Sequence, residues 1–483
     1  MKQKKSTSSS SSRKEISQYY HQIKGAVACL LFLSILLSGC KKLIELDAPK
    51  TEVLGTDVFS TDASAQSAVI GAYANIINLQ AFPNIGYFSS LSADEMDPTS
   101  TFYLYLNFAN NTLTPSDYNI PGLWTGFYKT IFQANSIIEG VKASTGMSDS
   151  IKARLTGEAK FLRALSHFYL VGFFGNVPLI TSTDVKVNAT MARTATATVY
   201  HQIIADLQDA ENTLPEDYSY YSNDRDRPNK YAAAAFLARV YLYTGDYTNS
   251  EKQATIALSS SLYTLLQGDD ISNIFLKESQ ESIFALNPAT STGKVVFPDA
   301  YYYGNGVQYG TLYGSSYVLT DSLAKAFESG DLRYSNWVDS FEYSGTTYYY
   351  SKKYKDYDYS KQPTEYSVMF RLSEQYLIRA EARTNLNNLS GAATDLNVIR
   401  NRAGLANTMA VTQTDLLNAI MKERRVELFL EYGNRWLDLK RTGLANAVMA
   451  AAKPAIWTSI DVLYPIPANE IKNNPALTQN DGY

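Results

Sequence analysis

The stretch IMKERRVELFLEYGNRWLDLKRTG, residues 420–443, is the part of the sequence from which the fold is best inferred. Apolar residues recur here and just before it at intervals that place them on one face of a helix: Leu417, Ile420, Leu428 and Tyr432. Arg424 lies on that face, and a guanidinium is costly to bury unless carboxylates pair with it. Glu427 and Glu431 follow one and two turns on and can reach it. We expect the helix to end at Gly433.

A second charged and aromatic group follows that glycine: Arg435, Trp436, Asp438 and Arg441. We interpret the polar residues of the whole stretch as a buried ion-pair network that fixes how the last helices pack: Arg424, Glu427, Glu431, Arg435 and Asp438. The alternative is an active site built on Glu427 and Asp438. The neighbouring arginines disfavour it, because they would keep both carboxylates ionised rather than ready to exchange protons.

The N-terminal segment has the features of an export signal. Six basic residues lie in its first part, and a short apolar run, residues 25–37, follows them. That run is too short to span a bilayer comfortably. It leads into Leu37-Ser38-Gly39-Cys40, which resembles a bacterial lipoprotein signal. We therefore predict a signal peptide at 1–39, a lipid on Cys40 and an extended tether at 40–56.

Cleavage before Cys40 would change what the mature chain contains. It removes Cys29, so Cys40 becomes the only cysteine and no internal disulfide or cysteine nucleophile remains. The loss of six basic residues and one acidic residue shifts the formal net charge from −4 to −9. That charge argues against nucleic acid as a partner. Acyl chains on Cys40 would hold the protein to a membrane without a spanning helix.

Most of the remaining sequence has helical periodicity. Segments 123–141, 151–173, 198–214 and 230–244 are predicted helices, whereas 80–121 is predicted to be rich in loops. Residues 232–258 resemble tetratricopeptide spacing, and 376–400 can be laid over them with Ala380 on Ala238. Antiparallel helix pairs are the unit this implies. We predict a mainly α, tetratricopeptide-like scaffold over about 57–260 and 365–445, with large loop-rich excursions and short β-hairpins.

Tyrosine is concentrated between the two repeat-like segments. The chain has 37 Tyr, and fourteen of them lie between Tyr301 and Tyr359, among many Gly and Ser. We predict a loop excursion over about 261–364, with short strands at 348–350 and 352–359. Loops on a rigid scaffold are where binding residues concentrate. The tail, 446–483, contains Pro465, Pro467 and Pro475, which exclude a long helix there.

Four segments together resemble the SusD/RagB family of surface glycan-binding lipoproteins. They are residues 161–178 (FLRALSHFYLVGFFGNVP), 371–383 (RLSEQYLIRAEAR), 423–443 (ERRVELFLEYGNRWLDLKRTG) and 464–483 (YPIPANEIKNNPALTQNDGY). The resemblance implies one SusD-like domain over 57–483 in an outer-membrane lipoprotein. It further implies non-enzymatic capture of an oligosaccharide or polysaccharide, delivered to a TonB-dependent β-barrel transporter that the protein covers as a lid. Residues 41–44 are not an obvious surface-export signal, so exposure at the cell exterior rests on the family alone.

A sugar presents apolar C–H faces and a polar rim, so aromatic rings suit the faces and amides, carboxylates or guanidiniums suit the hydroxyls. Each stacked ring would contribute on the order of 0.5–1.5 kcal/mol, which suits a protein that hands its ligand on. The candidate ligand-binding residues lie in two loop segments: Phe102, Tyr103 and Tyr105, then Tyr301, Tyr302, Tyr303, Tyr309, Tyr313 and Trp337. Packing of each ring beneath its own loop is the alternative.

Other functions are open at this stage. A glycosidase would need paired carboxylates, for which Asp94, Glu95 and Asp97 are the best cluster, although we expect consecutive loop acids to be solvated or to cap a helix. A scaffold that binds only protein, or a lid protein for peptides or another nutrient, also fits the repeats. We expect no cofactor. Calcium near Asp269 and Asp270 is not supported by a recognised motif.

Overall fold

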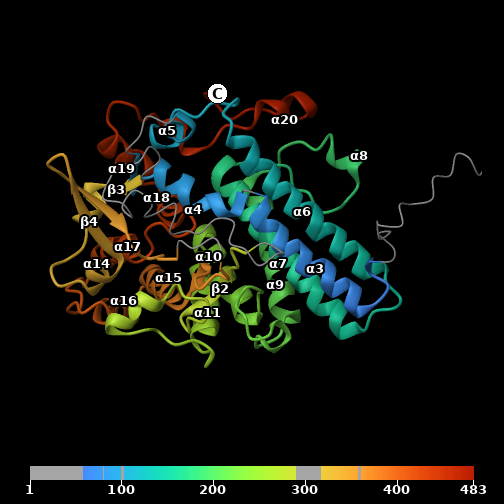
Figure 1. The fold of residues 1–483 in the computed structure, drawn as a ribbon, viewed down its shortest axis with the longest axis horizontal. Coiled ribbons are helices and arrows are strands. Elements are labelled where there is room, and N and C mark those ends of the chain that lie inside the picture. Colours follow the sequence, from blue (N-terminus) through green and yellow to red (C-terminus); the bar gives the residue numbers. More distant parts are fainter. Residues whose placement is uncertain (1–57, 80, 99–102, 290–316, 357–360) are drawn as a thin grey trace, which may run out of the picture. The chain divides into compact units, whose positions relative to one another are not determined.

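The structure is a computed structural model that describes residues 58–79, 81–98, 103–289, 317–356 and 361–483. Long helices dominate its first half. Their bounds are α3 (Asp62–Asn78), α4 (Ala81–Ser92), α5 (Tyr103–Ala109), α6 (Ile120–Ala143), α7 (Asp149–Phe174), α8 (Val185–Asn188) and α9 (Thr196–Thr213). Helix α7 packs between α6 and α9, and α3 lies against α6 and α7 (Figure 1). Apolar faces at helical spacing explain this packing, because each helix buries a stripe against its neighbour.

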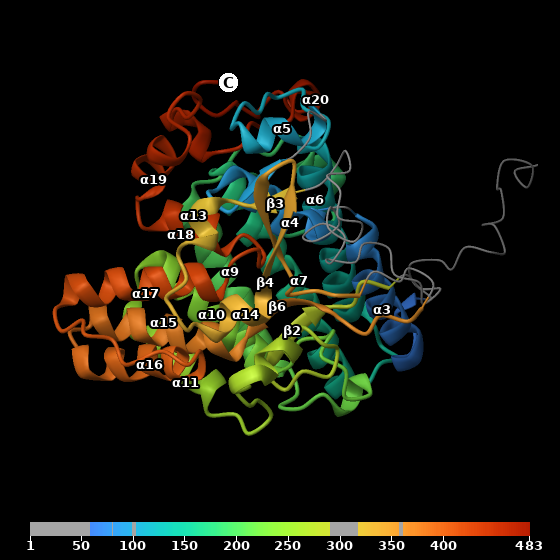
Figure 2. The ribbon, with the colours of Figure 1, turned by 60° about the vertical axis from the view of Figure 1, so that its left-hand side comes forward.

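Two helix pairs follow and pack against each other. The first pair is α10 (Lys230–Thr244) with α11 (Tyr247–Leu258), and the second is α15 (Leu372–Asn385) with α16 (Leu389–Arg402). Two short 3-10 helices, η2 (Ser219–Tyr221) and η3 (Gly268–Asn273), flank the first pair in the sequence. Helix α11 packs on α15, which joins the pairs into one layer (Figure 2). Ala238 and Ile378 are fully buried in a shared cluster, and Ser250 Oγ donates to the Ala238 carbonyl at 2.9 Å. The small residues of the repeat therefore lie where the helices touch, and the predicted scaffold class is confirmed.

Short strands interrupt the helical order. Their bounds are β1 (Met96–Pro98), β2 (Ser282–Leu286), β3 (Tyr317–Leu319), β4 (Val338–Tyr343), β5 (Thr346–Ser351) and β6 (Ser367–Arg371). One sheet has the order β1-β3-β5-β4 and the other pairs β2 with β6, antiparallel throughout. Ser344 and Gly345, with φ of 51° and 79°, form the two-residue turn between β4 and β5. The strand predicted at 348–350 is thus present within β5, whereas residues 352–356, the described part of the strand predicted at 352–359, form no strand.

The predicted loop-rich region 80–121 contains more regular structure than expected. Helix α4 lies inside it and is largely buried, with Ile85 and Leu91 fully covered. Serine hydroxyls of α4 form hydrogen bonds within the helix and with a distant residue. Ser89 Oγ donates to the Ile85 carbonyl at 2.5 Å, and Ser92 Oγ is hydrogen-bonded to Tyr464 Oη at 2.8 Å. Tertiary burial therefore overrides the loop-like composition.

The remaining helices are mostly short. They are α13 (Asp321–Ala324), α14 (Leu332–Trp337), α17 (Gln413–Glu427), α18 (Asn434–Arg441), α19 (Ala445–Ala452), η4 (Ser459–Val462) and α20 (Ala468–Asn473). The prediction that the helix containing Arg424 ends at Gly433 is wrong, because α17 ends at Glu427. Lys353 Nζ donates to the Glu427 and Phe429 carbonyls, each at 2.9 Å, and so satisfies groups that a continuing helix would use. Gly433, with φ of 78°, begins α18 instead.

Residues Thr56–Tyr483 form one compact unit. The predicted signal peptide, Cys40 and the tether lie outside the described residues. Across the described ranges, none of the helices is both long and apolar enough to cross a membrane.

Candidate functional site

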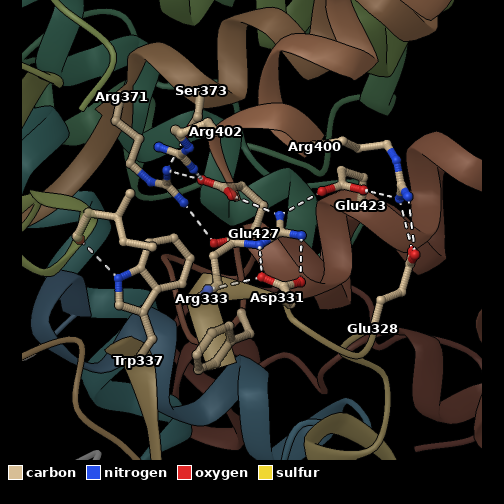
Figure 3. A network of polar contacts seen from close by, with 12 residues as sticks. Glu328, Asp331, Arg333, Trp337, Arg371, Ser373, Arg400, Arg402, Glu423 and Glu427 are labelled. Atoms are coloured by element: carbon tan, nitrogen blue, oxygen red, sulfur yellow. Dashed lines mark hydrogen bonds and ion pairs between the residues drawn. The ribbon is translucent and has the colours of Figure 1, made fainter. Parts of the chain in front are cut away.

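Glu427, the last residue of α17, is at the centre of a buried charge network (Figure 3). Its carboxylate accepts from Arg371 Nη1 at 2.5 Å and Arg333 Nη1 at 3.0 Å, and it also pairs with Arg402. These guanidiniums come from the end of β6, from α14 and from the end of α16. One carboxylate thereby ties four segments that are distant in sequence.

The network continues on both sides of Glu427. Arg333 also pairs with Glu423 at 2.6 Å and with Asp331 at 2.8 Å. Arg371 and Arg402 share the buried Glu281, at 3.0 and 2.9 Å. Charges of both signs alternate through this interior, so each buried ion has a partner, which is the condition under which such burial is tolerated.

Burial alone would raise the pKa of the Glu427 carboxyl. The guanidiniums of Arg402, Arg371 and Arg333 outweigh that effect and hold its pKa well below the usual range. A carboxylate so firmly ionised neither donates a proton as a general acid nor accepts one readily as a base. The geometry supports a packing role for Glu427.

Arg424 does not pair with Glu427 or Glu431, as the sequence led us to expect. Its Nε donates to Asp438 Oδ2 at 2.7 Å, and Arg441 Nε donates to Asp438 Oδ1 at 2.7 Å. Because α17 ends at Glu427, Glu431 is not on the same helix as Arg424. Burial would raise the pKa of Asp438, but Arg424 and Arg441 hold it below its ordinary value. An active site of Glu427 and Asp438 therefore has no support.

The other two members of the predicted network are also in ion pairs. Glu431 accepts from Arg371 Nε at 2.7 Å and from Lys353 Nζ at 2.6 Å. Arg435 donates to Asp94 at 2.7 Å through its Nε. These contacts connect the segment between α17 and α18 to β6 and to the residues after β5, and they connect α18 to the loop after α4.

Of the three carboxylates considered for a glycosidase, Asp94 and Glu95 are buried, whereas Asp97 is exposed on β1. Asp94 is 5 % exposed and pairs with Arg435 and, at 2.8 Å, with Arg425. Glu95 is 2 % exposed and accepts from Ser90 Oγ at 2.8 Å. Burial raises the pKa of Glu95 to about 7, whereas the arginines lower that of Asp94 against the effect of burial. The expectation of solvated acids is wrong for Asp94 and Glu95, because both side chains are buried inside the fold.

One aromatic candidate for ligand binding is placed clearly, and its assignment is wrong. Trp337 is fully buried, and its indole Nε1 donates to the Ile271 carbonyl at 3.0 Å. The Phe275 and Phe429 rings lie 6.2 and 6.3 Å from it. A ring enclosed in this way fills the core and offers no face to a sugar.

The remaining aromatic candidates are not tested by the structure. Tyr103 and Tyr105 lie in α5 rather than in a loop, and their side chains are outside the description. The others fall outside the described residues: Phe102, Tyr301, Tyr302, Tyr303, Tyr309 and Tyr313. Asp269 and Asp270 lie in η3. Within the described ranges, no group of three or more His, Cys, Asp or Glu is arranged to hold a metal ion.

The sequence reasoning overlooked several exposed rings. Tyr118 and Tyr220 are 77 % and 61 % exposed. On the β4–β5 hairpin, Phe341 stacks on Tyr348 with ring centroids 5.5 Å apart. Phe341 and Tyr348 lie directly opposite on the two strands, so recognition of the turn at Ser344-Gly345 in the sequence could have identified the pair. Tyr118 and Tyr220 had no comparable periodic signal.

The comparisons with known proteins agree with this architecture. Residues 57–242 match a family model described as "Starch-binding associating with outer membrane", and residues 300–483 match the model of the SusD family. The chain belongs to the SusD family. Its relatives include SusD-like protein P25 of Formosa agariphila, 24 % identical over 93 % of this chain and 97 % of the relative. The starch-binding protein SusD of Bacteroides thetaiotaomicron is 26 % identical over 70 % of this chain and 74 % of its own.

Solved SusD-family structures share the fold over nearly all of their length. A SusD superfamily protein from Bacteroides vulgatus superposes with a TM-score of 0.77 at 20 % identity, covering 88 % of this chain and 100 % of the other. A laminarin-binding SusD-like protein gives 0.74 at 24 % identity, covering 87 % and 99 %. At these identities the likeness establishes the fold.

Proposed function

We propose that this protein binds an oligosaccharide or polysaccharide at the cell surface without cleaving it and delivers it to a TonB-dependent outer-membrane transporter, which it covers as a lid. The observation that carries the proposal is the SusD-family fold, which extends across both family-model matches. Relatives of that fold are named as starch-binding and laminarin-binding proteins. A lipid on Cys40 would hold the protein at the outer membrane, facing the exterior.

The buried carboxylates support the non-enzymatic part of the proposal. Glycoside hydrolysis needs two carboxyl groups on either side of a bound sugar, one protonated and one ionised. Glu427 and Asp438 are both enclosed, and arginines lower the pKa of each. Glu95 has the raised pKa expected of an acid, but it is buried beside Asp94, which is occupied by two arginines. These side chains hold the fold together and present no catalytic pair to solvent.

The test is calorimetric titration of the detergent-extracted mature protein with a panel of soluble glycans that includes starch and laminarin oligosaccharides. We expect heat from at least one member and no shortening of that glycan on chromatography after long incubation. Sugar products would instead identify a glycosidase. If every glycan gives no heat while a peptide panel does, the nutrient class is wrong but the lid role stands. Co-extraction of a large β-barrel would support the transporter partnership.

A further inference from the structure

A large cavity lies away from the Glu427 network, between the ends of α7 and α18 and the C-terminal tail. Its volume is about 790 Å³, within the range of small-ligand sites. Gly172 and Gly175 line it from the end of α7, Tyr200 from α9, and Tyr243 from α10. The remaining wall comes from α18, from η4 with the residues after it, and from residues 478–481 of the tail.

The charges on this wall are predominantly positive, with Arg193, Lys440 and Arg441 against Asp481. Lys440 lines the cavity, and its Nζ donates to the Gly172 carbonyl at 2.5 Å. Among the described residues, no carboxylate lies within ion-pairing distance of this ammonium. The Trp436 ring, 5.6 Å away, covers it on another side. A partly desolvated ammonium with one carbonyl partner leaves two donors and a net charge for a bound anion.

The other cations of the cavity are already committed to protein groups. Arg441 is held by Asp438 and Glu381. Arg193 donates to the carbonyls of Asn176, Thr478 and Gln479 at 2.7–3.2 Å. Burial lowers the pKa of Arg193, and the carboxylate on the cavity wall, Asp481, offsets part of that effect. Lys440, with one carbonyl partner, is therefore the cation of this wall with the fewest hydrogen bonds to the protein.

We propose that this cavity binds a saccharide unit bearing a carboxylate or sulfate group, with the anion against the Lys440 ammonium. The inference rests on the proposed function, since it names the class of glycan unit that the protein takes. Tyr200 and Tyr243 supply apolar ring surface beside the charge.

The charge state of Lys440 gives the proposal a pH signature. Burial lowers the pKa of Lys440 to about 7, so the free ammonium loses its proton just above neutral pH. An anion beside it favours the charged form, so binding takes up a proton and affinity falls as pH rises from about 6 to about 9. The titratable and charged groups around the cavity, which could modify this response, come from three helices, the loop before α9 and the tail: Asp438, Arg441, Tyr200, Tyr243, Arg193 and Asp481.

The experiment titrates the mature protein with trigalacturonate, a sulfated carrageenan hexasaccharide, inorganic sulfate and neutral maltotriose. Lys440→Met should weaken binding of an acidic oligosaccharide by about tenfold or more, because a charge-assisted hydrogen bond is lost. Lys440→Arg should keep the binding and remove its decline above neutral pH. Lys325→Met is the matched control, since Lys325 is 69 % exposed in a surface ion pair. Ser459→Trp, which narrows the cavity at an exposed lining residue, should also weaken binding.

The outcomes separate this inference from the function on which it rests. If the protein binds neutral glycans from the wider panel while acidic oligosaccharides bind equally to wild type and Lys440→Met, only the inference fails. Binding of inorganic sulfate without preference for either acidic saccharide would also overturn it. If no glycan of either panel binds, both proposals fail. Thermal unfolding of each variant establishes that a loss of binding is not a loss of fold.

Discussion

At the scale of single residues, Glu427 is the position where a small change has the largest expected effect. It is fully buried and pairs with three guanidiniums. Glu427→Gln keeps the shape but removes the negative charge, which leaves buried cations undercompensated. We expect the free energy of unfolding to fall by about 3–5 kcal/mol, measured by urea denaturation. Asp321→Asn, in an exposed pair with Lys325, is the control and should leave the urea midpoint unchanged. Equal midpoints for Glu427→Gln and wild type would show that the network does not stabilise the fold.

His167 gives a residue-scale prediction about pH. It is fully buried in α7, and burial with the nearby Arg163 lowers its pKa to about 3. Between that value and its unfolded pKa of about 6.5 the unfolded chain binds the extra proton, so stability falls as pH falls. We expect the stability of wild type relative to His167→Gln to drop by about 2 kcal/mol from pH 7 to pH 5.

The matched control for His167 is His201, which lies on the exposed face of α9. Urea midpoints for His201→Gln should follow those of wild type across the same pH range. Parallel curves for His167→Gln and wild type would contradict the proposed neutral state of the buried ring. The comparison uses differences between variants because many other groups titrate in this range.

At the scale of elements, two glycines with no neighbouring atoms test the effect of glycine inside a helix and at a helix end. A Cβ at either Gly71 or Gly245 would meet nothing within 4 Å. Gly71 lies inside α3, so Gly71→Ala should stabilise the protein by about 0.5–1 kcal/mol. Gly245 ends α10 with φ of 77°, so Gly245→Ala should destabilise it by about 1–2 kcal/mol. Thermal or urea unfolding would show the opposite signs, and shifts of the same sign would refute the backbone argument.

The elements also show what sequence periodicity could predict. Segment 230–244 is predicted as a helix and matches α10, because a long alanine-rich stretch between Asn229 and Gly245 has a clear start and end. Helix α4 was not predicted because its serines, Pro83 and Gly86 are residue types typical of loops. The burial that stabilises it comes from residues far along the chain, in α6 and α18. The early end of α17 depends on Lys353, which is 74 residues from Glu427. No local pattern contains that information.

At the scale of the whole molecule, the helix-pair scaffold was predictable and the partners within the charge network were not. Ala238 and Ala380 fall at equivalent small positions, and both are fully buried where pairs of helices touch. By contrast, the charged residues of 420–443 were identified as a network, but Arg371, Arg402 and Arg333 join it from three other elements. Residue type predicts that a buried charge needs a partner, whereas the choice of partner depends on tertiary packing.

The proposed attachment of the molecule to a membrane depends on one group, the Cys40 thiol. Only two cysteines occur in the chain, so Cys29→Ser and Cys40→Ser form a matched pair. If Cys40 carries the lipid, Cys40→Ser should abolish incorporation of labelled palmitate and move the protein out of the outer-membrane fraction, because several buried acyl chains are what makes anchoring durable. Cys29→Ser should keep both the label and the location. Label retained on Cys40→Ser, or a mature N-terminus other than residue 40 by mass spectrometry, would place the anchor elsewhere and remove the basis for a tethered lid.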